Sequence, residues 1–364
     1  MSYNGKTNWQ DGEIVHAQDM NRIEQGILDA YDKANAALTD YAQHGVTMGH
    51  ENDIYVAKIG SLFEFTPLEA SYGGNISAIA TDDNYVYVGG GITQTVRKLR
   101  KSDLSQVAES ENYGGDILAI TVDDDYVYVG GLKARTVKKL NKSNLSQVAE
   151  SENYGGANSG GAIYAIATDD DYVYIGGGTV QTVRKLNKSN LSQVAESANC
   201  GGDIRAIVVD DNDFIYVGGT AQTVKRLHKF DLALLDESAS YGGEIYTMAI
   251  DDDFIYVGGE TRTVKKLNKF DLSQVAKSSP YHGFIYAIAT DDEFVYIGGG
   301  WTATPTVRKL RKSDLSQVAE SENYGGDILA ITVDDNKFVY VGGGADNIKV
   351  IENRELIKII RRYQ

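Results

Sequence analysis

The sequence predicts an all-β repeat protein, and three features carry this prediction. Seven copies of one unit follow one another along the 364-residue chain. Each copy contains four short segments rich in Val, Ile and Tyr that alternate with a period of two, as in residues 85–88, and this period is typical of strands. The composition agrees, since Gly (39) and Tyr (24) are abundant and Pro (3) is rare.

Each copy begins with Tyr-Gly-Gly or a variant of it. The copies start at Tyr72, Tyr113, Tyr154, Cys200, Tyr241, Tyr281 and Tyr324, so that successive starts are 40 to 46 residues apart. Each copy then runs through strand a, an Asp-rich turn, strand b ending in Gly-Gly, strand c, a Lys-containing turn and strand d. Repeats of this length with four strands are typical of propeller blades. We therefore predict a seven-bladed β-propeller over residues 53–364.

The two ends of the repeat region have to close the ring, because an uncovered edge strand promotes aggregation. Residues 347–364 can supply strands c and d of the seventh blade. Residues 54–71 offer a further hairpin. This hairpin either enters the last blade or covers its edge, and the sequence leaves both possibilities open.

Residues 1–52 differ from the repeats and form a predicted attachment and oligomerisation segment. Between residues 17 and 42, apolar side chains are spaced three and four apart, which predicts a short amphipathic helix or coiled coil. The candidate oligomerisation residues on this seam are Met20, Ile23, Ile27, Ala30 and Ala34. A helix that packs on its own propeller would show the same spacing, so both interpretations stay open.

The charge and the apolar pattern exclude several classes of partner. The chain has 35 basic and 51 acidic residues, and its net charge of -16 would repel nucleic acid and anionic membrane surfaces. No apolar run reaches the length of a signal peptide or a membrane span, and the single Cys200 allows no intramolecular disulfide. We expect a protein that is made in the cytoplasm without a signal peptide, binds no nucleic acid and does not insert into membranes.

The Asp clusters and Gly pairs resemble the sequences of metal-binding and phosphate-binding sites, but they recur in every copy, as a requirement of the fold would. The Asp clusters lie between strands a and b, where Asp favours hairpin turns, and no copy has the spaced pattern of a calcium loop. The Gly pairs precede strands, whereas a phosphate loop opens a helix. Lysines of the turns between strands c and d are expected to offset the Asp charges at the surface, each pair contributing under about 1 kcal/mol. We predict no metal, no cofactor and no catalytic residue.

Four acidic residues at the start of strand a need a separate explanation. They follow Tyr-Gly-Gly or its variant and are Asp116, Asp203, Glu244 and Asp327. Solvated strand ends are the favoured explanation. Converging carboxylates also bind cations or hydrolyse glycosidic bonds, so a cation in the central channel stays open and a polysaccharide-degrading enzyme is the third and least favoured function.

Variation among the copies is concentrated in the connections between strands b and c and between strands d and a. The two largest length changes are in residues 157–161 and 301–305, and both connections emerge on the same face of a propeller. Loops held by a rigid scaffold commonly carry binding residues. The candidate ligand-binding residues on this face are Trp301, Asn158, Arg135, Arg262, Tyr72, Tyr113, Tyr154, Tyr241, Tyr281 and Tyr324. Packing between blades is the alternative for the tyrosines.

The N-terminal segment carries a set of residues in a characteristic order. They are Trp9, Asp11, Gly12, Ala17, Asn21, Ile23, Glu24, Gly26 and Ile27. This pattern resembles the opening of tail-fibre and receptor-binding proteins of phages, prophages and phage-tail-like bacteriocins of Gram-positive bacteria, over about the first 40 residues. The resemblance implies attachment to a tail or baseplate, a homotrimer, location in a virion or tail-like particle, and a C-terminal module that meets the host surface.

Together these features predict a non-enzymatic receptor-binding protein. One face of the propeller would bind a glycan or protein on the bacterial surface. The alternative is a structural adaptor within the baseplate, whose partners are other tail proteins.

Overall fold

The computed structural model describes residues 54–155, 161–301 and 303–361. The predicted helix over residues 17–42, its five seam residues (Met20, Ile23, Ile27, Ala30, Ala34) and the candidate Asn158 lie outside this part of the chain. The chain divides into two compact units, residues 63–353 and residues 1–62 with 354–364. Within the described residues all regular elements are strands. This part of the chain contains no helix that could cross a membrane.

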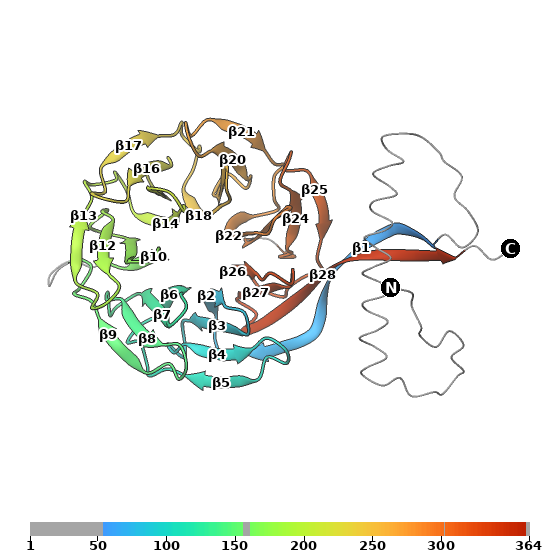
Figure 1. Cartoon of the computed structure of the whole chain (residues 1–364), viewed down its shortest axis with the longest axis horizontal. Coiled ribbons are helices and arrows are strands. Elements are labelled where there is room, and N and C mark those ends of the chain that lie inside the picture. Colours follow the sequence, from blue (N-terminus) through green and yellow to red (C-terminus); the bar gives the residue numbers. More distant parts are fainter. Residues whose placement is uncertain (1–53, 156–160, 302, 362–364) are drawn as a thin grey trace. The chain divides into compact units, whose positions relative to one another are not determined.

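Seven four-stranded sheets surround the axis of a ring, which confirms the predicted seven-bladed β-propeller (Figure 1). Blade 1 contains β2 (Ile76–Thr81), β3 (Tyr85–Gly90), β4 (Arg97–Arg100) and β5 (Gln106–Glu109). Blade 2 contains β6 (Ile117–Val122), β7 (Tyr126–Gly131), β8 (Lys138–Asn141) and β9 (Gln147–Glu150). Blade 3 contains β10 (Ile163–Thr168), β11 (Tyr172–Gly177), β12 (Arg184–Asn187) and β13 (Gln193–Glu196). In each blade, strands a to d run from the ring axis outwards.

The other four blades continue the same order. Blade 4 contains β14 (Ile204–Val209), β15 (Phe214–Gly219), β16 (Lys225–His228) and β17 (Leu234–Glu237). Blade 5 contains β18 (Ile245–Ile250), β19 (Phe254–Gly259), β20 (Lys265–Asn268) and β21 (Gln274–Lys277). Blade 6 contains β22 (Phe284–Thr290), β23 (Phe294–Gly300), β24 (Arg308–Arg311) and β25 (Gln317–Glu320). Blade 7 contains β26 (Ile328–Val333), β27 (Val339–Gly343), β28 (Asn347–Arg361) and β1 (Ile54–Ser71).

The seventh blade joins the two ends of the repeat region. Strand β28 supplies only strand c, and β1 is a single strand that pairs with β28 as strand d. The expectation that residues 347–364 form both outer strands and that residues 54–71 form a hairpin is therefore wrong. A strand d taken from before the first repeat ties the beginning of the repeat region to its end, so the ring cannot open at this blade without breaking the β1 to β28 hydrogen bonds.

The hydrophobic core lies between neighbouring blades. In one cluster, Tyr87 of blade 1 packs with Ile117 and Val127 of blade 2, and all three are fully buried. The Gly pair that ends strand b allows this close approach, since a Cβ added to Gly89 would come within 2.8 Å of the Ile117 side chain. Strand b is consequently buried on both faces, which explains why it reads as a nearly continuous apolar run.

The Asp-rich turns form the predicted hairpins and also join the blades. Asp82 Oδ1 accepts hydrogen bonds from the backbone amides of Asn84 (2.9 Å) and Tyr85 (2.8 Å). Its Oδ2 accepts the Tyr87 hydroxyl (2.9 Å) and lies 3.1 Å from Nζ of Lys142, in the next blade. The same Asp, Tyr and Lys meet at Asp123, Tyr128 and Lys188, at Asp251, Tyr256 and Lys312, and at Asp334, Tyr340 and Lys101.

These ion pairs are largely buried, which corrects the expectation that they lie at the surface. The side chains of Lys101 and Asp334 are 13% and 3% exposed, and the pair joins blade 1 to blade 7. Burial alone would raise the pKa of Asp82, Asp123 and Asp251, but hydrogen bonds from backbone amides and tyrosine hydroxyls, together with the neighbouring lysines, outweigh it and lower these pKa values below 3.8. The ionised carboxylates therefore stabilise the folded ring.

This arrangement predicts a loss of stability in acid. A carboxyl whose pKa is lower in the folded state contributes stability above its unfolded pKa of 3.8 and loses it as the pH falls through the folded value. The free energy of unfolding in denaturant is expected to change little from pH 7 to about pH 5 and to fall steeply below about pH 4. A variant with Asn at positions 82, 123 and 251 should show a shallower fall, and an equal fall in both proteins would contradict the assignment.

Candidate ligand-binding site

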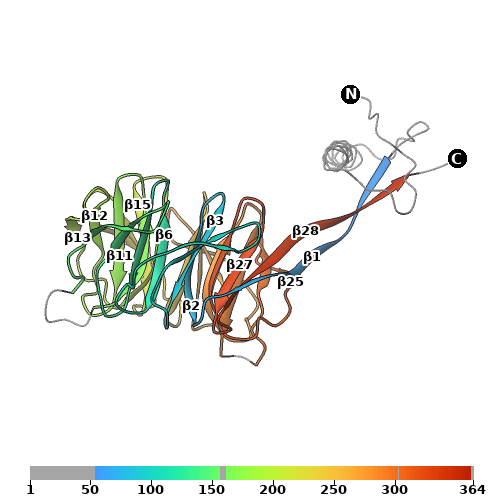
Figure 2. The ribbon, with the colours of Figure 1, turned by 90° about the horizontal axis from the view of Figure 1, so that it is seen from below.

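The loops between strands b and c and the connections between strands d and a lie on the same face of the ring, here called the loop face. The backbone amide of each first repeat residue donates to a carbonyl of a neighbouring b–c loop, as from Tyr113 to Gln94 (2.7 Å) and from Tyr281 to Arg262 (2.6 Å). Figure 2 shows the blades edge-on, with their strands running between the two faces. Tyr154, which precedes the first long insertion, and Pro305, which ends the second, therefore belong to the loop face. Residues 156–160 and 302, within or next to these insertions, lie outside the described part of the chain.

The six candidate tyrosines at the repeat starts are structural. Tyr72, Tyr113, Tyr154, Tyr241, Tyr281 and Tyr324 are all between 0% and 4% exposed. The Tyr154 hydroxyl donates to the carbonyl of Thr182 (2.5 Å) and accepts the amide of Gly177 (3.1 Å). Burial raises the pKa of Tyr154 to about 12, so this hydroxyl keeps the proton it donates. The prediction that these six rings contact a ligand is corrected, because they pack between blades.

The remaining described candidates lie in b–c loops. Trp301 is 78% exposed, in blade 6, and Arg262 is exposed in blade 5. Arg135 is partly buried in blade 2, where its carbonyl accepts the amide of Tyr154 (2.8 Å). The structure brings Trp301 and Arg262 together around one further ring, that of Phe284, and leaves Arg135 in a different part of the loop face.

Blade 6 departs from the repeat at two positions and thereby presents Phe284 and Trp301. Six blades have a glycine with positive φ after the first repeat residue, whereas blade 6 has His282 there, outside the positive-φ region. Strand a of blade 6 therefore begins one residue earlier, and Phe284 pairs with Gly300. In five other b–c loops a Gln or Arg with positive φ precedes Thr-Val, but Pro305 cannot adopt that conformation. Here the positive φ of 62° falls on Trp301.

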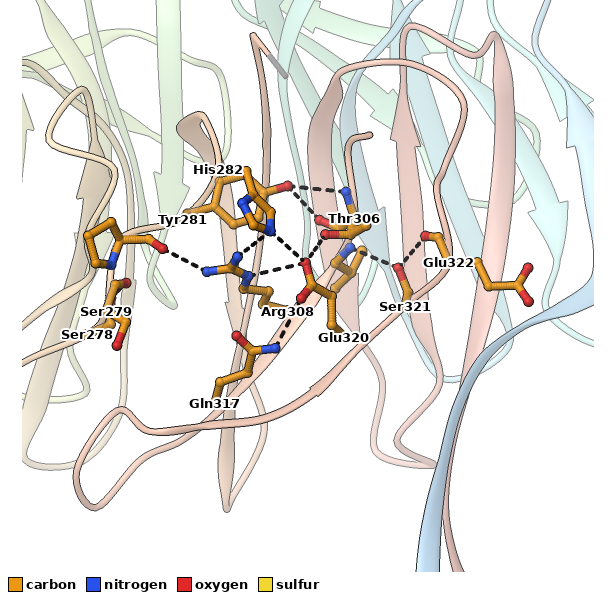
Figure 3. Close-up of polar contacts among 12 residues, drawn as sticks. Ser278, Ser279, Tyr281, His282, Thr306, Arg308, Gln317, Glu320, Ser321 and Glu322 are labelled. Atoms are coloured by element: carbon orange, nitrogen blue, oxygen red, sulfur yellow. Dashed lines mark hydrogen bonds and ion pairs between the residues drawn. The ribbon is translucent and has the colours of Figure 1, made fainter. Parts of the chain in front are cut away.

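A polar cluster fixes the outer side of this blade (Figure 3). The Arg308 guanidinium is nearly buried and donates to the carbonyl of Pro280 (2.8 Å) and to Glu320 Oε1 (3.3 Å). Its Nη2 lies 2.5 Å from Nε2 of His282. Burial alone would raise the pKa of Glu320, but the hydrogen bond from Thr306 and the Arg308 charge outweigh it and lower that pKa. The turn that leads to Phe284 is thus held by charged side chains of β24 and β25.

Aromatic and guanidinium groups form a continuous strip along the inner edge of the loop face, here called the aromatic strip. Its members are Tyr164, Arg205, Tyr246, Tyr286, Phe284 and Trp301. The first four each follow the first isoleucine of strand a in blades 3 to 6, which is the second position in blades 3 to 5 and the third in the longer strand of blade 6, and each is half-buried. Arg262 lies over the Phe284 ring at 5.8 Å.

The strip combines flat apolar surface with hydrogen-bonding groups. Burial, together with the nearby charges of Glu244 and Glu260, raises the pKa of Tyr246, so its hydroxyl stays protonated at neutral pH. Arg205 lies 3.5 Å from Glu244, and Asp327 accepts the backbone amide of Trp301 (3.2 Å). Flat rings beside guanidinium and carboxylate groups suit a ligand with apolar faces and many hydroxyls.

The acidic residues at the start of strand a have local partners. Besides Glu244 and Asp327, Asp116 accepts a hydrogen bond from Gln94 (3.5 Å), and the Asp203 backbone amide donates to the Thr220 hydroxyl (2.8 Å). In the described part of the chain, no three His, Cys, Asp or Glu side chains are grouped so as to hold a metal ion. The carboxylates of Asp116, Glu244 and Asp327 thus contact residues of the loops and of the strip.

Sequence reasoning identified Trp301 of the strip and the adjacent Arg262 but missed the other five members of the strip. The signal lies at the second position of strand a. The residue before it is Ile in all seven copies, whereas this position varies: Ser77, Leu118, Tyr164, Arg205, Tyr246, Tyr286 and Leu329. A comparison of the copies that looked within strands as well as loops would have found it.

Comparison with known proteins supports the fold. No family model and no curated protein matches the chain. It is similar to the WD40 β-propeller domain of Doa1, with a TM-score of 0.67 and 14% identity, over 80% of this chain and 96% of that one. It is also similar to the computationally designed protein Ika8, with a TM-score of 0.61 and 16% identity, over 80% and 99% of the two chains. At such identities the likeness concerns the fold alone, and the fold of this chain is the seven-bladed β-propeller.

Proposed function

We propose that the chain is the receptor-binding protein of a phage tail or tail-like particle, and that it attaches to a glycan on the bacterial surface through the aromatic strip. The observation that carries the binding role is the strip itself, where a repeated scaffold presents aromatic and guanidinium groups around the exposed Trp301. The resemblance of the first 40 residues to tail-fibre proteins supports the particle.

In this proposal the propeller binds without catalysis. Residues 1–52 join the chain to other tail or baseplate proteins and form a homotrimer, so that several propellers face the cell at once. Linked sites bind far more firmly than each site alone, because every later contact is intramolecular. Modest affinity of one strip is therefore sufficient for attachment of the particle.

Replacement of Trp301 by alanine is expected to weaken binding of the purified chain to Gram-positive cell-wall glycan by about thirtyfold or more, since a central aromatic residue of a binding site commonly contributes about 2 kcal/mol or more. The measurement is a titration of extracted glycan against the full chain. Ile92→Ala is the matched control, because Ile92 follows the same glycines in blade 1 and is also 78% exposed. The control should bind as the unmodified chain does.

Three outcomes would count against the proposal. Unchanged binding by the Trp301 variant would mean that the glycan does not bind at the aromatic strip. Absence of any binding to cells or glycan would contradict the proposed receptor-binding role. Release of reducing ends from the glycan, abolished by substitution of Asp116 or Asp327, would favour the polysaccharide-degrading enzyme instead.

A second candidate function, the baseplate adaptor, is favoured by two phenylalanines outside the loop face. Phe230 and Phe270 lie in the turns between strands c and d of blades 4 and 5 and are 80% and 82% exposed. Four other blades carry serine at this position: Ser102, Ser143, Ser189 and Ser313. If Phe230→Ser with Phe270→Ser abolishes binding to a purified tail protein while glycan binding persists, the adaptor role is supported.

A further inference from the structure

The aromatic strip crosses four consecutive blades without a break. Going around the ring from blade 6 towards blade 3, the ring centroids of Trp301 and Phe284 are 5.4 Å apart, and those of Phe284 and Tyr246 are 6.1 Å apart. Arg205 then lies over the Tyr246 ring at 5.5 Å and over the Tyr164 ring at 5.2 Å. Trp301 and Tyr164 are therefore joined by four successive contacts across strands β22, β18, β14 and β10, which are neighbours in the ring (Figure 1).

The strip has two ends. In the three remaining blades the second position of strand a holds Ser77, Leu118 and Leu329. These side chains offer neither an aromatic face nor a charged group. The surface suited to stacking therefore begins at Trp301 and stops at Tyr164, and it covers one side of the ring instead of repeating sevenfold.

The length of the strip decides between two kinds of ligand. Each contact along it spans 5.2 to 6.1 Å, the usual separation of two stacked or tilted rings. One sugar ring placed on Trp301 and Phe284 would cover one such step and leave Tyr246, Arg205 and Tyr164 unused. Several linked rings would cover them all.

The charges along the strip favour an uncharged ligand. Arg205 and Arg262 supply donors, while Glu244, Glu260 and Asp327 supply acceptors beside the same rings. The set holds two positive and three negative side chains, so a strongly anionic polymer gains nothing from it as a whole. Hydroxyl groups, which both donate and accept, match it.

We infer that the strip binds a linear, uncharged oligosaccharide segment of at least four sugar units, with one end on Trp301 and the other on Tyr164. This inference rests on the proposed glycan-binding function and adds the length and direction of the ligand. A terminal monosaccharide is not sufficient for full affinity.

The test is a titration of the full chain with a length series of one to six units, prepared by partial hydrolysis of the wall glycan that the chain binds. Affinity is expected to rise up to at least four units and then level off. Tyr164→Leu should lower the affinity for fragments of four or more units by about tenfold and leave shorter fragments unchanged. The fold accepts this change, since blades 2 and 7 carry Leu at this position.

Leu118→Ser is the matched control, because Leu118 occupies the same position in the next blade outside the strip and Ser77 shows that serine fits there. This variant should follow the unmodified chain at every length. An affinity already complete with one sugar, or a Tyr164→Leu variant equal to the unmodified chain at all lengths, would overturn the inference and leave glycan binding standing. If neither intact glycan nor any fragment binds, the proposed function itself fails.

Discussion

Replacement of Phe63 by alanine is expected to lower the free energy of unfolding by about 3–5 kcal/mol, the usual cost of truncating a buried phenylalanine. Phe63 lies in β1, is 5% exposed and stacks on Tyr296 of blade 6 at a centroid distance of 6.0 Å. It shares a cluster with Val339 and Ile351 of blade 7. The substitution leaves a cavity where strand d of the closing blade meets the core.

Chemical denaturation of the full chain measures this effect. Glu64→Ala is the control, since Glu64 is the next residue of the same strand and is exposed. Surface substitutions of this kind usually change stability by less than about 0.5 kcal/mol. Equal stabilities of the two variants would mean that β1 does not complete the seventh blade in solution.

Replacement of Asp334 by alanine is expected to cost about 3–5 kcal/mol as well, because loss of one partner of a buried ion pair leaves the other uncompensated. Asp334 lies 2.9 Å from Nζ of Lys101 and accepts the Tyr340 hydroxyl (3.1 Å) and the Phe338 amide (2.9 Å). All three bonds disappear in the variant. Two of them hold strand b of blade 7, and the third holds blade 1 against it.

The matched control is Asp335→Ala, which removes the same charge from an exposed neighbour. Denaturation at pH 7 should show the control close to the unmodified chain and Asp334→Ala far below it. If both variants lose the same small amount, the Asp, Tyr and Lys clusters act as ordinary surface pairs and not as ties between blades.

The sequence was sufficient for the elements of the fold. Alternation in segments such as residues 85–88 predicts strands, because successive side chains of a strand point to opposite faces. Asp at the a–b turns predicts hairpins, because its side chain bonds amides two and three residues ahead, as Asp82 does. The recurrence of these signals predicts seven blades. All of these effects act within a few residues.

Ring closure and the electrostatic ties needed the structure. Residues 54–71 contain apolar residues that suit a hairpin or one long strand, and their pairing with β28 joins segments almost 300 residues apart. Lysines of the c–d turns are polar in the sequence, and only the neighbouring blade buries them against Asp. Such contacts depend on how one sheet packs on the next.

The ligand-binding candidates also divide into those that the sequence could predict and those that only the structure could show. Exposure of Trp301 and Arg262 could be predicted, because loops that differ between copies are not required by the packing of the blades. The burial of Tyr154 and its five counterparts could not, since a repeated tyrosine serves equally well as a ligand contact or as a buried tie. Residues such as Tyr164 and Tyr246 are 82 positions apart in the chain. They share one strip because ring closure brings equivalent positions of consecutive blades side by side, and this proximity depends on distances that a one-dimensional pattern does not contain.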